Sequence, residues 1–309
     1  MPILNTAILS YINYFSLERT CRNIFNQDKK RDNNHCPDQG VVLSSRYLII
    51  YRDSFMQIIL SPAKTMTGTT DIIAPQGSTP RFQDEAQALA LLMAQLPAKD
   101  LATILKISPK VAADAYWRFQ EFHSTERPGL QAILAYTGVV FQHLQPADFT
   151  TEEFLFAQKH LKIASGCYGT LRALDLIKPY RMEFNTKVPD LPESIIANFW
   201  KERQTQTLID DIRNDGGLLV NLASQDIQPA YHWKRIASET RIITPDFKVY
   251  KQGKQKTIVI YAKMARGEMT RYIIKRQITD VEALKEFQWE GFTYKEELST
   301  PNNWVFLQE

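Results

Sequence analysis

The residues whose types and spacing best suit chemistry lie between positions 165 and 187, where charged and phenolic side chains alternate with apolar ones. This stretch reads SGCYGTLRALDLIKPYRMEFNTK, and its polar members include Tyr168, Arg172, Asp175, Tyr180, Arg181 and Glu183. Charges held among apolar residues need partners, and arginine forks bind carboxylates or phosphates. The stretch therefore predicts one wall of a polar cleft, and the alternative is a structural network of buried ion pairs.

Three apolar segments, each predicted as a strand, run directly into polar residues. Residues 57–60 precede Ser61 and Lys64, residues 218–220 precede Asn221 and Ser224, and residues 258–261 precede Lys263 and Arg266. Open α/β sheets bind ligands at the carboxyl ends of their strands. We expect a cationic pocket that suits an anion such as phosphate. Its members would be Lys64, Arg172, Arg181, Lys263 and Arg266, offset by Glu183, Asp175 and Asp226. For Lys64 the alternative is an ordinary exposed turn lysine.

Two short helices are predicted at 98–105 and 111–122, joined by a turn that carries Lys106 and Lys110. The pair resembles a helix-hairpin-helix, a module that directs backbone N–H groups and lysines at DNA phosphates without reading bases. Ser108 and Pro109 replace the usual turn glycine. The alternative is an ordinary helix pair with a proline in the first helical position.

The secondary-structure elements that must position these residues are a mixture of predicted helices and predicted strands. Helical periodicity or end signals predict helices at 82–95, 150–160, 194–212 and 269–278. Apolar runs predict strands at 57–60, 130–141 with a turn at Gly138, 218–220, 290–295 and 304–307, and a hairpin of 241–251 with 256–261 around Gly253. We expect these helices and strands to belong to one compact domain over residues 56–309.

The composition and charge of the whole chain argue against several classes of protein. The chain has 309 residues with a net charge of +3, but residues 248–276 hold nine Lys or Arg against one acid. Three cysteines without metal spacing favour a reducing compartment and predict no metal or cofactor site. There is no run of 18 apolar residues and no secretory signal pattern, so we expect a cytoplasmic protein without a membrane partner.

Residues 1–55 differ in composition from the rest of the chain, since 26–40 are polar and turn-rich. A short strand is possible at 47–51. We expect the compact domain to begin at Met56 and residues 1–55 to be an extension or a mis-assigned start. A chain beginning at Met56 should then be soluble and folded, and its aggregation would contradict the hypothesis.

Five segments together resemble the YaaA family of bacterial peroxide stress proteins. They are SPAKTM (61–66), SGCYGTLRALDLIKPYRMEF (165–184), VNLAS (220–224), YAKMARGEMTRYII (261–274) and FQWEGFTYKEELS (287–299). The resemblance covers Met56 to the C-terminus and implies one unusual α+β fold, a positively charged cleft and a helix-hairpin-helix-like element. It also implies binding to double-stranded DNA, with lowered intracellular free iron and less DNA damage during hydrogen peroxide stress.

Carried over by position, the resemblance implies a set of cleft residues. They are Ser61, Lys64, Tyr168, Arg172, Tyr180, Arg181, Glu183, Asn221, Ser224, Lys263 and Arg266, with the hairpin at 105–111. The chain departs from the family's usual Gly-Asp-Val-Tyr at Val139 and Phe141. It also departs after NLAS, where Gln225, Asp226 and Ile227 stand, and at Met264.

Two functions are possible as hypotheses. In the first, Lys and Arg neutralise the phosphates of double-stranded DNA, so binding is independent of sequence and weakens with salt. In the second, the cleft is the active site of an enzyme that acts on a nucleotide or nucleobase, with Glu183 as general acid or base. Direct iron binding is disfavoured, because the five histidines are scattered and the cleft is cationic.

Overall fold

The sheet at the centre of the protein is mostly parallel. The computed structural model describes residues 55–251 and 253–309, so the strand predicted at 47–51 and all of the predicted extension except Phe55 lie outside the described residues. The strand order is β4-β3-β1-β6-β7-β10-β9, with β8 paired to β7. The strands are β1 (Gln57–Leu60), β3 (Leu161–Ser165), β4 (Gly169–Arg172), β6 (Leu218–Asn221), β7 (Arg241–Lys251), β8 (Lys254–Lys256), β9 (Phe292–Tyr294) and β10 (Asn303–Gln308).

Parallel pairing runs from β3 through β1, β6 and β7 to β10, whereas β4, β8 and β9 pair antiparallel. The strands β1, β3 and β6 are buried along their whole length. Strands covered on both faces read as continuous apolar runs, which is why the strands at 57–60 and 218–220 were predicted; β3 was not predicted as a strand. The register places Ile59 opposite Asn221, so the polar segments after β1 and β6 leave the sheet at the same end.

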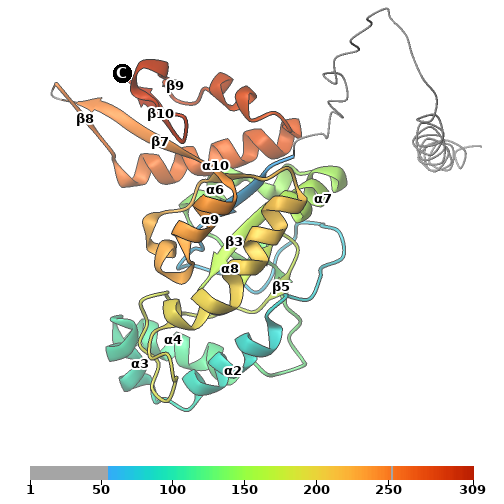
Figure 1. Cartoon of the computed structure of the whole chain (residues 1–309). Helices are drawn as coiled ribbons and strands as arrows, with labels where there is room; N and C mark the ends of the chain where they lie inside the picture. The colour runs from blue at the N-terminus through green and yellow to red at the C-terminus, as the bar shows by residue number, and fades with distance from the viewer. Residues whose placement is uncertain (1–54, 252) are drawn as a thin grey trace, which may run out of the picture. The chain divides into compact units, whose positions relative to one another are not determined.

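The helices surround this sheet, and those near the N-terminus gather at one end of it. They are α2 (Gln83–Ala94), α3 (Ala98–Leu105), α4 (Pro109–Gln120), α5 (Ala132–Ala135), α6 (Val139–Leu144), α7 (Thr151–His160), α8 (Ile196–Asn214), α9 (Trp233–Glu239) and α10 (Val259–Arg276). Short 3-10 helices are η1 (Pro146–Asp148), η2 (Gln225–Ala230), η3 (Val281–Glu286) and η4 (Glu296–Leu298). In Figure 1, α2, α3 and α4 lie at the opposite end of the molecule from α10 and the β7–β8 hairpin.

Two helix starts are explained by capping chemistry. Thr150 and Glu153 form a reciprocal capping box at α7, which confirms the predicted start of that helix. Ser108 caps α4 by accepting a hydrogen bond from the Val111 N–H at 3.5 Å, and Pro109 occupies the first helical position, where no N–H is needed.

The strand predicted at 130–141 is wrong. Within this segment, β2 (Leu130–Gln131) is a short strand that pairs with β5 (Leu176–Ile177), and α5 and α6 follow it. The AILA segment of α5 is fully buried, and a short apolar run does not distinguish a core strand from a core helix. Gly138 does not form the predicted turn. It lies in extended backbone just before α6, and a Cβ at this position would lie 2.7 Å from the Ala63 Cβ.

The core strand predicted at 256–261 is also wrong. The hairpin around Gly253 exists, with Gly253 at a φ of +72°, but β8 ends at Lys256 and α10 begins at Val259. Ile258 is the N-cap of α10 in extended backbone, and Val259, Ile260 and Tyr261 form the exposed first turn of this 18-residue helix, whose later turns pack against α6 and β7. The helix predicted at 269–278 is the second half of α10.

One apolar core joins the sheet and the helices, and Trp200 of α8 is its largest fully buried side chain. Its indole N–H donates to the Gly166 carbonyl at 2.8 Å. Among the described helices, none is by itself long and apolar enough to cross a membrane; α2 and α3 meet that test only as a pair, bent by 116°.

Candidate functional site

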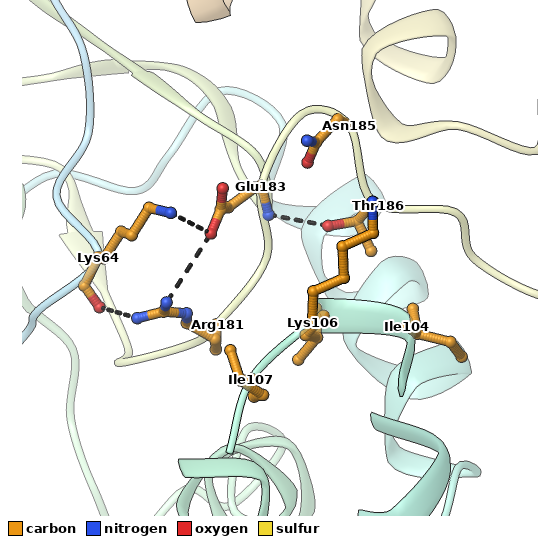
Figure 2. Close-up of a pocket in the computed structure, with 9 residues that line it drawn as sticks. Lys64, Ile104, Lys106, Ile107, Arg181, Glu183, Asn185 and Thr186 are labelled. Carbon is orange, nitrogen blue, oxygen red and sulfur yellow. Dashed lines mark hydrogen bonds and ion pairs between the residues drawn. The ribbon is translucent and has the colours of Figure 1, made fainter. Parts of the chain in front are cut away.

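Lys64, Arg181 and Glu183 converge on one point, as the sequence predicted (Figure 2). The Lys64 ammonium lies 2.8 Å from the Glu183 carboxylate, and the Arg181 guanidinium lies 3.8 Å from the same oxygen. Arg181 also donates to the Lys64 carbonyl at 3.0 Å, which fixes the loop after β1 against the segment after Tyr180. The Glu183 side chain remains 36% exposed, so the trio is open to a ligand.

The segment that carries Arg181 and Glu183 is anchored by buried hydroxyl groups. Tyr180 OH lies 2.8 Å from both Tyr136 OH and Ser165 Oγ, and burial raises the pKa of Tyr180 well above its ordinary value. The Glu183 N–H donates to Thr186 Oγ1 at 3.0 Å, which closes a tight turn. Tyr180 is therefore a positioning residue for its two charged neighbours.

A cavity of about 200 Å³ separates this trio from the turn between α3 and α4 (Figure 2). Ile104, Lys106 and Ile107 line one side of it, and Asn185 and Thr186 line the other with the trio. Lys106 ends α3 in the left-handed conformation, with a φ of 53°, and its side chain is exposed. A lysine at this point adds a third cation to the margin of the cavity.

Lys110 lies in the first turn of α4 and is exposed. It does not line the cavity, but it belongs to the same hairpin of helices as Lys106. The N-terminus of an α-helix such as α4 carries a partial positive charge, which adds to the charges of the two lysines.

A second polar group lies where β1 and β6 end. Ser61 Oγ accepts from the Ser224 N–H at 2.8 Å and lies 3.0 Å from Ser224 Oγ, which donates to Asp226 at 3.3 Å. Asn221 caps the same segment by accepting from the Ala223 N–H. Burial lowers the pKa of Arg266 on α10, although the charges of Asp246 and Asp226 oppose this shift.

Arg172 does not join the predicted pocket. Its guanidinium donates to Asp175 at 2.8 and 3.1 Å and to the Thr79 carbonyl at 3.0 Å. Asp175 is fully buried, so this pair is the structural ion pair that stood as the alternative. Tyr168 is buried as well, where its hydroxyl accepts from the Lys178 N–H at 2.9 Å.

Lys263 lies on α10 rather than at the end of a strand, and it is exposed. The predicted single pocket is thus divided. Lys64, Arg181, Glu183 and Lys106 surround the cavity. Ser61, Asn221 and Ser224 lie at the ends of β1 and β6, Arg266 lies on α10, and Arg172, Tyr168 and Tyr180 support the fold.

Sequence reasoning missed Tyr136, Asn185 and Thr186. Tyr136 falls in the segment predicted as a strand, although it is buried against Tyr180. Thr186 comes three residues after Glu183, and a short polar side chain at that spacing often closes a turn, which was a usable signal.

Comparison with known proteins agrees with the resemblance drawn from the motifs. The family model described as "Peroxide stress protein YaaA" matches residues 56–298. The chain belongs to the YaaA peroxide stress protein family. A UPF0246 protein of Parabacteroides distasonis is 61% identical over 254 residues, which cover 82% of this chain and 100% of the relative. Similar relatives are UPF0246 proteins of Bacteroides thetaiotaomicron, 46% identical over 82% of this chain and 98% of the relative, and of Porphyromonas gingivalis, 39% identical over 82% and 100%.

Two of the departures from the YaaA pattern, Phe141 and Ile227, fall on packed positions, whereas Gln225 and Asp226 are exposed. Phe141 is buried with its ring centroid 5.2 Å from that of Tyr136, and Ile227 is buried in η2. Cys167, within the main YaaA motif, is fully buried, and this burial raises the pKa of its thiol. Because Arg172 is bound to Asp175, it is not free to stabilise a Cys167 thiolate.

Proposed function

We propose that this member of the peroxide stress family binds double-stranded DNA without reading its sequence. The observation that carries the proposal is the position of the α3–α4 hairpin, whose turn lysine adjoins the cavity formed with Lys64 and Arg181. Four cations, including Lys106 and Lys110, stand against the single carboxylate of Glu183 in this region. A surplus of cations at a helix N-terminus suits a phosphate backbone.

The geometry of the hairpin supports contact with phosphates rather than bases. Lys106 and Lys110 are exposed on either side of Ser108, and α4 presents its N-terminal end between them. A helix end and two flexible lysines position a backbone but carry no sequence information. We therefore propose a helix-hairpin-helix-like role for α3 and α4, in a protein that works in the cytoplasm.

The test is a salt titration of fluorescence anisotropy with random-sequence duplex DNA. The affinity of the unaltered protein should fall steeply with salt. The double variant Lys106→Gln, Lys110→Gln should reduce the magnitude of the negative slope of log K against log salt by about 1.8, because each phosphate contact contributes about 0.9. Lys99→Gln, at the far end of α3, is the matched control and should leave the slope unchanged. Absence of duplex binding at low salt would refute the proposal.

We further propose that DNA occupancy limits oxidative damage and accompanies a lowering of intracellular free iron, as the family resemblance implies. Direct iron coordination at the cavity has no support, because Lys64, Lys106 and Arg181 repel a divalent cation. Cells lacking the gene should show more DNA strand breaks after hydrogen peroxide, and the Lys106→Gln, Lys110→Gln variant should fail to restore protection.

An enzymatic role is the second candidate, because Glu183 is a partly exposed carboxylate held between two cations. Its cavity of about 200 Å³ is smaller than the roughly 300–1,000 Å³ typical of small-molecule sites, which places this candidate second. Glu183→Gln should abolish any turnover of nucleotides while sparing duplex affinity. If duplex affinity falls as far as it does in Arg181→Ala, Glu183 has a structural role instead.

A further inference from the structure

A second cavity, of about 240 Å³, lies where β7 and β10 begin. Its lining combines four charged side chains with two aromatic ones, contributed by β7, η3, β9, η4 and β10. They are Arg241, Glu282, Lys285, Tyr294, Glu296 and Trp304. Figure 1 shows β9 and β10 at the opposite end of the molecule from α3 and α4. The second cavity is therefore separate from the one beside the α3–α4 turn.

The strand register places Arg241 and both rings on one face of the sheet. Trp304 of β10 is paired with Pro245 of β7. Tyr294 of β9 is paired with Phe306, which is two residues after Trp304. Paired residues point to the same face, and successive side chains along a strand alternate between faces. Arg241 is four residues before Pro245, so it points to the face that carries the two rings.

The 3-10 helix η3 covers this face and brings an ion pair to the rings. Glu282 and Lys285 are three residues apart, a spacing at which the side chains of a 3-10 helix eclipse, and their charged groups lie 2.7 Å apart. The Lys285 ammonium also lies 5.3 Å from the centroid of the Tyr294 ring and 5.1 Å from that of Trp304. Cations are attracted to ring faces, so Lys285 has its partners within the protein.

Arg241 and Glu296 are the other two charges of the lining, and both are exposed. Neither side chain makes an ion pair or a hydrogen bond with any residue in 55–251 or 253–309. The opposite charges close to them in sequence are engaged elsewhere, because Glu239 is paired with two other arginines and Lys295 is paired with Glu309 at 2.7 Å. The cavity therefore offers one guanidinium and one carboxylate to a ligand.

The hydroxyl groups between η4 and β10 support the wall of the cavity. Ser299 Oγ donates to the Lys295 carbonyl at 2.6 Å and accepts from the Val305 N–H at 2.9 Å. Thr300 Oγ1 accepts from the Asn303 N–H at 3.1 Å. Because these hydroxyl groups are already bonded to the backbone, charge recognition falls to the guanidinium and the carboxylate.

One available charge of each sign identifies the class of ligand. A guanidinium makes forked contacts with a carboxylate, and a carboxylate binds an ammonium group. A ligand with only negative charge would be repelled by Glu296, and one with only positive charge would be repelled by Arg241. The volume is below the roughly 300–1,000 Å³ typical of ligand pockets, so the ligand must be small. A free amino acid with an apolar side chain has both charges and a group that suits the rings.

We infer that this cavity is a binding site for a free amino acid with an apolar side chain. Arg241 binds the carboxylate of the ligand, and Glu296 binds its ammonium group. Tyr294 and Trp304 contact its side chain. The inference goes beyond the proposed duplex binding and does not depend on it, because the two cavities share no lining residue.

The experiment measures binding of phenylalanine and leucine to the full chain by saturation-transfer-difference NMR. We expect a Kd of about 1 mM or below for at least one of them, because very small ligands gain much binding free energy per atom. Arg241→Gln and Glu296→Gln should each weaken binding about tenfold or more, because each variant loses a hydrogen bond between charged groups.

Two derivatives of phenylalanine assign each charge of the ligand to its partner. Phenylalanine amide lacks the carboxylate, so it should bind the unaltered protein about tenfold more weakly, and Arg241→Gln should add little further loss. N-acetylphenylalanine lacks the ammonium group, so Glu296→Gln should add little further loss for this ligand. This pattern of non-additive losses would not arise from a general change in the charge of the protein.

Matched controls separate this cavity from the rest of the molecule. Glu297→Gln and Lys234→Gln each remove an exposed charge that does not line the cavity, and both should leave amino-acid affinity unchanged. The double lysine variant of the α3–α4 turn should weaken duplex binding alone, whereas Arg241→Gln and Glu296→Gln should leave duplex affinity unchanged. Failure of one proposal is thus distinguishable from failure of the other. Unchanged thermal unfolding will verify that each variant is folded.

Three results would overturn the inference. They are no binding of either amino acid at millimolar concentration, binding that survives both Arg241→Gln and Glu296→Gln, and equal affinity for phenylalanine and its two derivatives. An equal loss in Glu297→Gln would also overturn it, because the effect would then come from net charge and not from contact. Loss of duplex affinity in Arg241→Gln would assign Arg241 to the DNA-binding surface instead.

Discussion

Replacing Gly267 by alanine should destabilise the protein more than the same replacement at a glycine that has open space around its Cβ position. Gly267 is buried in the third turn of α10, where that helix crosses α6. A Cβ built there would lie 2.2 Å from the Val140 carbonyl oxygen and 2.8 Å from the His143 Cβ. An ordinary carbon–oxygen contact is about 1 Å longer, and neither obstacle is the end of a flexible side chain, so the two helices must separate.

The expected loss is about 3 kcal/mol, at the upper end of the range for overpacking a core, because backbone rather than side chain must move. For a domain of this size, that corresponds to a fall in Tm of about 6–12 °C. Gly217→Ala is the control. Gly217 has a φ of +78° and nothing within 4 Å of its Cβ position, so only backbone strain of about 1–2 kcal/mol applies.

Urea denaturation followed by tryptophan fluorescence measures both variants. Equal slopes with a lower midpoint for Gly267→Ala will indicate a loss of stability rather than a change in the unfolded state. If Gly267→Ala costs no more than Gly217→Ala, then α6 and α10 are not in close contact in solution, and the reasoning from the Cβ position is refuted.

Three further predictions concern the scaffold. Thr150→Ala should lower the free energy of unfolding by about 1 kcal/mol through loss of the α7 cap, and Thr150→Ser should restore it in the same urea assay. Arg172→Ala should cost about 3–5 kcal/mol by leaving buried Asp175 unpaired, yet leave duplex affinity per folded molecule unchanged; lost affinity would return Arg172 to the binding site. Burial alone would raise the pKa of Asp215, but the hydrogen bond and charge of His160 at 2.6 Å, the hydrogen bond from Gln57 and the charge of Lys159 together outweigh burial and hold that pKa below the ordinary 3.8. Stability from this group is therefore present above about pH 4 and lost below it, so the pH profile of Asp215→Asn should be flatter between pH 5 and 2, and an identical profile would contradict the assignment.

The elements that could be predicted from the sequence are those with one strong signal. Continuous apolar runs bounded by turn residues predicted β1 and β6, and capping residues predicted the start of α7. The segments at 130–141 and 256–261 failed because apolar β-branched residues fit a core helix or an exposed first helical turn as well as a strand. Tertiary packing decided those cases, and no local pattern carries it.

Part of the candidate site could also be predicted from the sequence. Lys64, Arg181 and Glu183 were grouped correctly because they lie near the ends of predicted elements and have complementary charges. Arg172 was misplaced because composition cannot tell an arginine that binds a ligand from one that binds a buried aspartate. The cavity also depends on Lys106 and Thr186, whose proximity arises only when the α3–α4 hairpin folds against the segment after Tyr180.

The sealed thiol of Cys167 has a consequence for life under oxidant. Hydrogen peroxide attacks the thiolate, and a fully buried thiol with a raised pKa offers almost none. The segment that carries Arg181 and Glu183 therefore needs no reductant to keep its shape during a peroxide burst. Cys167 is therefore suited to resist oxidation by peroxide and not to act as a peroxide sensor.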